Sequence, residues 1–317
     1  MIISEIIKLI KESENIAILS HAAPDGDSIG SSLALYNSII SIGKKAKVII
    51  DDDVPVIYRF LKNADEICYV DTVDKFDLAI VLDSSGVDRL GNSSKYLVNK
   101  KVVNIDHHIS NTGFGTYNIV HTDAAATAEI IYKIIIKMGI RIDKDIAGCL
   151  YAGIVTDTGK FQYSNTTSET HQIASELLKH GVNSSEFFKL IYQNITKEKT
   201  KLIGESINIM EFYCEDKISV ITLSKEQFLK TGAKEEDTEG IIDFARDINS
   251  VELALLFRES KDGNIKISFR SKDCINVNVF AGKFGGGGHK SSAGATVSGD
   301  IISVKEKVLS KAFELFR

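Results

Sequence analysis

An Asp-His-His triplet, residues 106–108, places one carboxylate and two imidazoles directly after the apolar run 102–105. This run is short and rich in β-branched residues, which is typical of a buried strand. Carboxylates and imidazoles bind divalent cations and exchange protons near neutral pH. The triplet therefore marks a strand end at which metal-dependent or acid–base chemistry is expected.

Acids and histidines also follow other short apolar runs in the first half of the chain. Asp83 comes directly after one strand-like run, and His21 follows another with one residue between them. The loop after His21 contains proline and glycine, which favour a turn. Residues two apart in an extended loop point the same way, so Asp25 and Asp27 are expected to offer one carboxylate to each of two neighbouring cations. The candidate metal ligands are His21, Asp25, Asp27, Asp83, His107 and Asp157.

This mixture of carboxylates and imidazoles predicts a site for two divalent cations. Carboxylates suit Mg²⁺ and Mn²⁺, and the imidazole nitrogens favour Mn²⁺ over the alternative, Mg²⁺. Two such ions about 3.5–4 Å apart hold a phosphate and lower the pKa of a bridging water. The residue types thus indicate hydrolysis of a phosphate ester. Other acids have plainer explanations, and residues 51–53 are expected to form a solvated turn.

The elements that would position these residues alternate along the first half of the chain. Short β-branched runs predict buried strands, and the segments between them have helical spacing. The fold class is therefore α/β, with a parallel sheet that helices cover on both faces. Ligands of such sheets bind at the carboxyl ends of the strands. The expected strands are 16–19, 47–50, 78–82 and 102–105, and the expected helices are 1–11, 28–42, 124–138, 145–155 and 171–180.

The second half of the chain has a different pattern. Strands are expected at 217–223 and 251–259, and Asp262-Gly263 predicts a hairpin that joins the latter to 264–270. Helices are expected at 239–248 and 304–316, which makes this part a smaller, mixed α/β domain. The predicted organisation is a catalytic domain at residues 1–186, a helical linker at 187–201 and a substrate-binding domain at 202–317.

Composition narrows the class of protein. The 317 residues are 44% hydrophobic and 26% charged with a net charge of −5, which predicts a soluble globular protein and argues against binding long nucleic acid through phosphates alone. The four cysteines, Cys68, Cys149, Cys214 and Cys274, form no CxxC pair, so reduced thiols are expected. Without a signal peptide or an apolar run of about 20 residues, a cytoplasmic location away from membranes is expected. The sequence leaves open whether the protein is a monomer or a homodimer.

The metal motifs resemble the DHH phosphoesterase superfamily. His21, Asp25 and Asp27 match its first motif, and the triplet at 106–108 matches the motif that names it. Asp83 and Asp157 match two further motifs. The resemblance implies that one ion is held by His21, Asp25 and Asp83. It implies that the other is held by Asp27, Asp83, His107 and Asp157, with Asp83, Asp106 and His108 as the catalytic residues. In this scheme His108 faces the substrate phosphate, and Asp106 orients an imidazole.

The second half resembles the DHH-associated C-terminal domain. Its glycine run ends at His289 and is followed by Ala293-Gly294, and the segment 268–271 matches another substrate motif. Glycines let backbone N–H groups approach an anion, and the Arg270 guanidinium can pair with a phosphate. The expected substrate-binding residues are His108, Arg258, Arg270, Ser271, Gly286, Gly287, Gly288 and His289.

The combination of both halves resembles the nano-RNase and pAp-phosphatase group. This resemblance implies that short oligonucleotides are degraded to mononucleotides and that 3′-phosphoadenosine 5′-phosphate (pAp) is converted to AMP, in a cleft between the two domains. An alternative is a phosphodiesterase that acts on cyclic di-AMP or its linear product pApA. A different class, a non-catalytic nucleotide-binding protein, predicts lost ligands, whereas every expected ligand position is filled.

Overall fold

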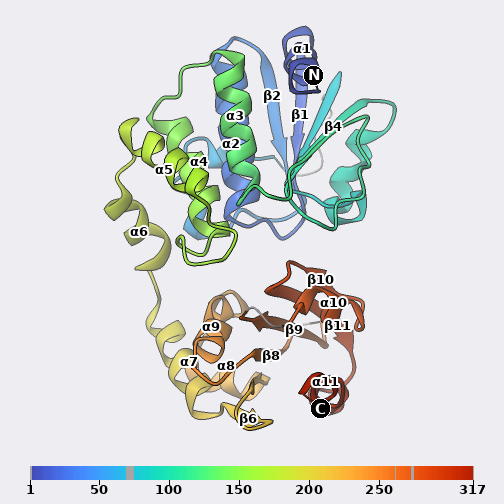
Figure 1. Ribbon diagram of the computed structural model, residues 1–317, viewed down its shortest axis with the longest axis vertical. Coiled ribbons are helices and arrows are strands. Elements are labelled where there is room, and N and C mark those ends of the chain that lie inside the picture. Colours follow the sequence, from blue (N-terminus) through green and yellow to red (C-terminus); the bar gives the residue numbers. More distant parts are fainter. Residues whose placement is uncertain (1, 69–74, 261, 273–274, 317) are drawn as a thin grey trace. The chain divides into compact units, whose positions relative to one another are not determined.

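The computed structural model describes residues 2–68, 75–260, 262–272 and 275–316, and its chain divides into two units, Met1–Asn194 and Ile195–Arg317 (Figure 1). Of the residues discussed above, Cys274 lies outside the described part. The stretch 187–201, expected as a helical linker, contains the end of α6 (Ser184–Tyr192), four non-helical residues and the start of α7 (Lys197–Asn208). No helix in the described part of the chain is long and apolar enough to cross a membrane.

The first unit is built on a five-stranded parallel sheet with the strand order β2-β1-β3-β4-β5. The four expected strands are present, within two residues of their expected bounds. The fifth, β5, was not expected, because it is four residues long and has only one fully buried side chain. The strands are β1 (Asn15–Leu19), β2 (Lys45–Ile49), β3 (Leu78–Leu82), β4 (Lys101–Asp106) and β5 (Tyr117–Val120).

Helices cover one face of this sheet. Apolar side chains of six helices share a single core with alternate residues of the strands, such as Ile16, Ile18, Ile80 and Ile105. Four of these helices are α1 (Ile2–Glu12), α2 (Gly26–Ser41), α3 (Thr127–Met138) and α4 (Lys144–Asp157), and the other two are α5 (Ser168–Lys179), which packs on α4, and α6. Figure 1 shows α2, α3 and α4 side by side.

The opposite face of the sheet has a smaller cover. Its core includes Leu19, Val81 and Val102, and it is closed by Leu90 and other residues of the 3₁₀ segment η3 (Val87–Leu97). The expected cover is therefore present on this face too, but it is a 3₁₀ segment and not an α-helix. The connection from β3 to β4 is too irregular to form a full α-helix, since Gly91 has a left-handed backbone in the middle of η3.

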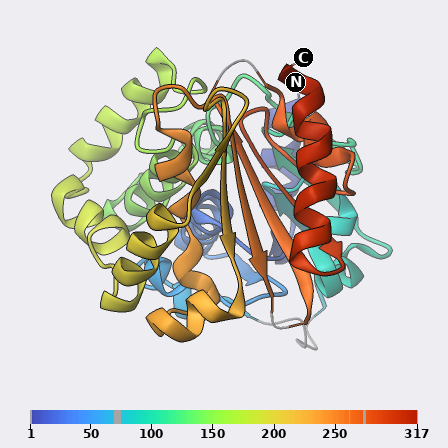
Figure 2. The ribbon, with the colours of Figure 1, turned by 90° about the horizontal axis from the view of Figure 1, so that it is seen from below.

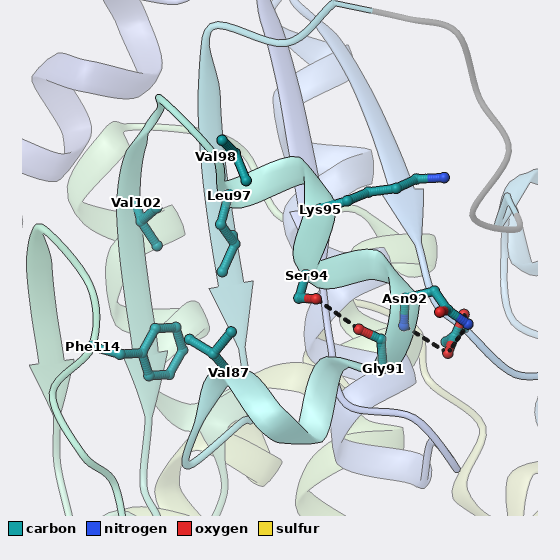
Figure 3. A pocket seen from close by; sticks show the side chains of 10 residues that line it. Val87, Gly91, Asn92, Ser94, Lys95, Leu97, Val98, Val102 and Phe114 are labelled. Carbon is teal, nitrogen blue, oxygen red and sulfur yellow. Dashed lines mark hydrogen bonds between the residues drawn. The ribbon is translucent and has the colours of Figure 1, made fainter.

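A groove of about 970 Å³ lies beside η3 and β4 (Figure 3). Its apolar lining comes from Val87, Leu97, Val102 and Phe114, and its polar end is formed where Asn92 donates to the Asp51 carboxylate. The Asp51 carboxylate thus stabilises η3 through this hydrogen bond. The expectation of a solvated turn acid holds only in part for Asp51. None of the candidate metal ligands lines the groove.

The second unit has a six-stranded mixed sheet with the order β10-β11-β9-β8-β7-β6. The predicted hairpin is confirmed, because β8 and β9 pair antiparallel. Among the described strands of this sheet, only β7 and β8 are parallel neighbours. The strands are β6 (Glu211–Tyr213), β7 (Ile218–Leu223), β8 (Leu253–Glu259), β9 (Asn264–Ser271), β10 (Gly287–Gly288) and β11 (Ser292–Ser298).

Helices pack on both faces of the second sheet, each on its own core. One core contains α10 (Val277–Gly282) and α11 (Ile301–Phe313), and the other contains α7 and α9 (Ile241–Arg246). Figure 2 shows α11, in dark red, on one side of the strands and the yellow α7 on the other. The predicted mixed α/β domain is confirmed.

Candidate metal centre

The first motif spans the start of α2. Asp25 is the N-cap of this helix, and its Oδ1 accepts hydrogen bonds from the N–H groups of Asp27 (3.1 Å) and Ser28 (3.0 Å). Asp27 already belongs to the first helical turn, where its side chain is buried. The expectation of an extended loop with parallel carboxylates is therefore wrong. Because the helix turns the backbone by about 100° per residue, the two carboxylates face different groups of ligands.

Glycines bring α4 close to α2. A Cβ at Gly30 would lie 2.4 Å from the Cys149 carbonyl oxygen, and a Cβ at Gly153 would lie 2.6 Å from Asp27 Oδ1. Only hydrogen-sized side chains permit this approach. The contact places Asp157, at the end of α4, beside the ligands that follow the strands.

Asp83 lies at the middle of the site. It follows β3 directly, is 1% exposed and has a left-handed backbone (φ 56°), with its N–H donating to the Ile105 carbonyl (3.0 Å). A left-handed backbone is rare for a residue other than glycine and is found where the surrounding structure imposes it. This conformation turns the Asp83 carboxylate toward the ends of the neighbouring strands.

Two groups of candidate ligands share the Asp83 carboxylate. His21 Nε2 lies 3.8 Å from Asp25 Oδ2 and 3.7 Å from Asp83 Oδ2. On the other side, His107 Nε2 lies 3.6 Å from Asp83 Oδ1 and 3.3 Å from Asp157 Oδ2. His107 Nε2 is also 4.0 Å from Asp27 Oδ2. Asp83 thus presents one oxygen to each group.

The Asp106 carboxylate organises the triplet. Its Oδ1 accepts hydrogen bonds from the backbone N–H groups of His107 (2.8 Å) and His108 (3.2 Å) and from His108 Nδ1 (2.7 Å). The Nδ1 of His107 donates to the Ala124 carbonyl (3.1 Å), which directs its Nε2 to the aspartates. The three residues therefore have different surroundings, although they are consecutive.

Asn111 connects the triplet to the strand end at Asp83. Its side-chain N–H group donates to Asp106 Oδ2 (2.6 Å), Asn104 Oδ1 (2.8 Å) and the Ser84 carbonyl (3.1 Å). The two hydrogens of the Asn111 amide are shared among these three acceptors. Asn111 therefore holds one oxygen of the Asp106 carboxylate, while His108 holds the other. The loops after β3 and β4 are thereby joined through one amide.

Crowded carboxylates and imidazoles shift the pKa values of the site. Burial, and then the nearby Asp83 carboxylate, raises the pKa of Asp27, and burial raises the pKa of Asp157 to about 7. Burial alone would lower the pKa of His21, but the hydrogen bond to Asp83 and the Asp25 charge raise it to about 9. The histidines hold the pKa of Asp83 well below its usual range although burial opposes them.

The donor set fits divalent cations. In the group His21, Asp25 and Asp83, one ligand atom from each residue lies within 4.8 Å of the others, and the same holds for Asp27, Asp83 and His107. Such spacing leaves room for one ion bound at about 2.0–2.3 Å by oxygen and nitrogen. Shared carboxylates with imidazoles suit Mn²⁺ or Mg²⁺ and not a thiolate-preferring metal.

The second unit gathers some of the expected substrate residues at one end of its sheet. Arg270 pairs with Ser292, and Gly288 pairs with Ala293, so that Arg270 and the glycine run lie near the same end of β11. Asn278 Oδ1 accepts a hydrogen bond from the Gly288 N–H (2.9 Å) and holds the run in place. Arg270 and the glycines of this run were expected to act together, and the strand register places them near one another in the second unit.

Two expected members of this set lie elsewhere. Arg258 pairs with Lys266 of β9. Lys266 precedes Arg270 by four residues, which places the two positions about 13 Å apart along the strand. The Arg258 guanidinium forms an ion pair with the Glu235 carboxylate (2.8 Å). Ser271 is 2% exposed and donates to the Ile275 carbonyl (2.6 Å). Successive strand residues point to opposite faces, so Ser271 points away from the side of Arg270. The expectation that both lie with Arg270 in a phosphate site is corrected.

Sequence reasoning also missed residues that support the centre. Thr127 Oγ1 donates to Asp83 Oδ1 (3.0 Å), and Asp52 Oδ2 accepts the N–H of Ala23 (2.7 Å), which has a left-handed backbone in the first-motif loop. Asp52 is thus not only a solvated turn acid. Asn111 was missed as well, although its place three residues after the triplet was a usable signal. Thr127 carried no such signal, because it is a single threonine at a helix start.

Comparisons with known proteins agree with both halves of this arrangement. Residues 15–154 match the DHH family, N-terminal domain, and residues 215–317 match the DHHA1 domain. The bifunctional oligoribonuclease and PAP phosphatase NrnA of Thermus thermophilus is 33% identical over 99% of this chain and 93% of its own length. The protein of the same name from Bacillus subtilis is 28% identical over 93% of each chain.

A solved structure has a similar architecture over the whole length. The exopolyphosphatase-related protein of Bacteroides fragilis is 29% identical, covers 99% of this chain and 97% of its own, and superimposes with a TM-score of 0.92. Similarity on this scale extends through both units and is not limited to the metal motifs.

Proposed function

Because this chain belongs to the DHH family of phosphoesterases, we propose that it hydrolyses very short oligonucleotides to mononucleotides and converts pAp to AMP, with two divalent cations. The observation that carries the proposal is the position of Asp83 between the His21–Asp25 group and the Asp27–His107 group. Relatives named as oligoribonuclease and PAP phosphatase support the substrate class, since they align over nearly the entire chain. Mn²⁺ is the proposed ion, because each group includes an imidazole.

The side chains divide the chemistry among them. When bound, divalent ions supply Lewis acidity and a nucleophilic hydroxide near neutral pH. His21, Asp25, Asp27, Asp83, His107 and Asp157 are the proposed ligands. Asp106 holds Nδ1 of His108, so that Nε2 is the nitrogen proposed to face the substrate phosphate. Burial alone would lower the pKa of His108, but the hydrogen bond to Asp106 and the charges of the neighbouring carboxylates raise it to about 9, so the imidazole is cationic near neutral pH and suited to an anion.

The second unit is proposed to bind a terminal phosphate. Arg270 offers a planar guanidinium, and the glycine run offers backbone N–H groups that an anion can approach. His289 belongs to the same segment, with its own N–H donating to the Ser292 carbonyl (2.6 Å). Binding of one terminal phosphate group favours substrates of two to a few nucleotides over long strands.

A substrate panel tests the proposal. The protein is incubated with Mn²⁺ and pAp, pApA, cyclic di-AMP, pyrophosphate or RNAs of two to five nucleotides, and kcat/KM is measured for each. We expect the highest values for pAp and the shortest RNAs. A preference for cyclic di-AMP or pyrophosphate would assign a different substrate class, and binding without any hydrolysis would identify a non-catalytic nucleotide-binding protein.

The glycine run permits a sharper prediction, because its members differ in what a Cβ would contact. At Gly286 a Cβ would lie 2.1 Å from the Gly294 carbonyl oxygen, whereas at Gly287 its nearest neighbour is Asn278 Oδ1 at 3.5 Å. Gly287→Ala is therefore expected to fold normally and to raise KM for phosphate-terminated substrates about tenfold or more. Gly286→Ala is expected to lower the free energy of unfolding by about 1–3 kcal/mol.

Thermal unfolding and steady-state kinetics on both variants check this prediction. Asn278→Ala serves as a comparison, since it removes the acceptor of the Gly288 N–H without adding bulk at the run. Unchanged KM in a stable Gly287→Ala protein would show that the Gly287 backbone does not approach the substrate.

A further inference from the structure

Thr127 is the first residue of α3 and contacts two of the proposed metal ligands. Its side chain is fully buried, and its Oγ1 donates to Asp83 Oδ1 (3.0 Å). Its backbone N–H donates to Asp27 Oδ2 (2.6 Å), and the next N–H, of Ala128, donates to Asp27 Oδ1 (3.0 Å). One residue thus fixes carboxylates that come from two different elements.

The start of α3 explains why these donors are available. The N-cap, Ala126, has no side chain that could accept from the first turn. The free N–H groups and the positive end of the helix dipole therefore act on Asp27, which caps α3 from another helix. At the first helical position there is no preceding helical carbonyl for a threonine hydroxyl to bond, so Oγ1 can turn to Asp83.

The hydroxyl contacts only one of the two Asp83 oxygens. Oδ1, which accepts from Thr127, is the oxygen 3.6 Å from His107 Nε2, and Oδ2 is the oxygen 3.7 Å from His21 Nε2. A carboxylate can rotate about its terminal torsion, which is broad. A hydrogen bond to one oxygen opposes this rotation, and the left-handed backbone of Asp83 fixes the direction from which the carboxylate enters.

We propose that Thr127 is a positioning residue that assigns the two oxygens of Asp83 to two different cations. The inference rests on the two-cation site proposed above. Asp83 Oδ1 is held for the ion of the Asp27–His107 group, and Oδ2 remains directed to the ion of the His21–Asp25 group. Thr127 acts through these carboxylates and is not itself a ligand.

Metal titration of matched variants tests this role. Thr127→Val keeps the shape of the side chain and replaces the hydroxyl by a methyl group. Thr127→Ser keeps the hydroxyl donor. Thr127→Ala removes the hydroxyl and adds no methyl group in its place. Mn²⁺ binding is measured by calorimetry, and electron paramagnetic resonance distinguishes isolated Mn²⁺ from a coupled pair. Thr231→Val is the control, because Thr231 is a buried threonine of the second unit whose hydroxyl donates to the Gln227 carbonyl (2.7 Å).

We expect wild type, Thr127→Ser and Thr231→Val to bind two Mn²⁺ ions and to give the coupled signal. Thr127→Val and Thr127→Ala are expected to bind one ion with nearly wild-type affinity and the other about 10–100-fold more weakly. The circular dichroism of the metal-free proteins shows which variants fold. One folded variant without the hydroxyl, either Thr127→Ala or Thr127→Val, is enough for the comparison with Thr127→Ser.

Three results would overturn the inference, and they are distinguishable. If wild type binds two ions and the variants without the hydroxyl bind both as tightly, Thr127 does not position Asp83, while the proposed function stands. If wild type itself fails to bind two ions, the two-cation site is wrong, and this inference is lost with it. Weakening of both ions to the same extent would also contradict the assignment of one oxygen to each cation.

Discussion

Asp83→Asn is expected to lower kcat/KM for short oligonucleotides and pAp by on the order of 10³-fold or more, because it neutralises the carboxylate shared by both groups of ligands. The substitution preserves the size of the side chain, and its oxygen can still accept from Thr127 Oγ1. The loss therefore reports the missing negative charge and second ligand oxygen, and not a cavity.

Kinetics with saturating Mn²⁺ and calorimetric titration check this result together. Asp65→Asn is a matched control, since Asp65 is an exposed aspartate of the 3₁₀ segment η2 (Ala64–Glu66). Hydrolysis that survives Asp83→Asn within about tenfold of wild type would contradict a shared ligand at this position.

The second large effect is a steep dependence of metal affinity on pH. Divalent cations must displace the protons that the metal-free site binds, and the raised pKa values of His21 (about 9) and Asp157 (about 7) place those protons near neutrality. Both shifts are upward, so both make binding weaker as the pH falls. From about pH 6 to about pH 8, His21 contributes roughly a hundredfold and Asp157 roughly tenfold to the gain in Mn²⁺ affinity.

Calorimetry in buffers of different ionisation enthalpy measures the affinity and the number of protons released. The same shifts have the opposite sign for the stability of the metal-free protein. A group with a raised pKa stabilises the fold at low pH, and this contribution disappears as the pH rises through the folded pKa, so the metal-free Tm is expected to fall from about pH 6 to about pH 9.

Asp157→Asn separates the contributions. It is expected to weaken Mn²⁺ binding at high pH and to remove about one tenfold step from the pH dependence, while the part due to His21 remains. An affinity that does not change with pH, with no proton release, would show that the site is already deprotonated before the metal binds.

Much of this architecture could be predicted from local sequence patterns. Buried parallel strands are continuous runs of β-branched residues, so four strands of the first sheet and the residues at their carboxyl ends were found directly. The ligand candidates came from the same pattern, because chemistry at the end of a strand requires polar residues where an apolar run stops. The hairpin at Asp262-Gly263 was found from turn chemistry alone.

What could not be predicted depends on contacts between distant segments. Asp27 was expected in a loop because Pro24 and Gly26 favour turns, yet Gly26 begins α2, where a Cβ would lie 2.4 Å from Thr156 Oγ1. Thr127 and Asp52 matter only through partners far along the chain, which no local pattern shows. Arg258 was assigned to a phosphate by its charge, whereas the register gives it to Glu235.

The left-handed backbone of Asp83 has a consequence for how this protein tolerates change. A residue with a β-carbon costs about 1 kcal/mol more than glycine in this conformation, so backbone energy alone would select glycine at position 83. The backbone at the centre of the site therefore favours a residue that could not act as a ligand. A screen for stabilised variants of this protein must include turnover from its first round, because heat resistance alone does not report whether the carboxylate at position 83 is kept.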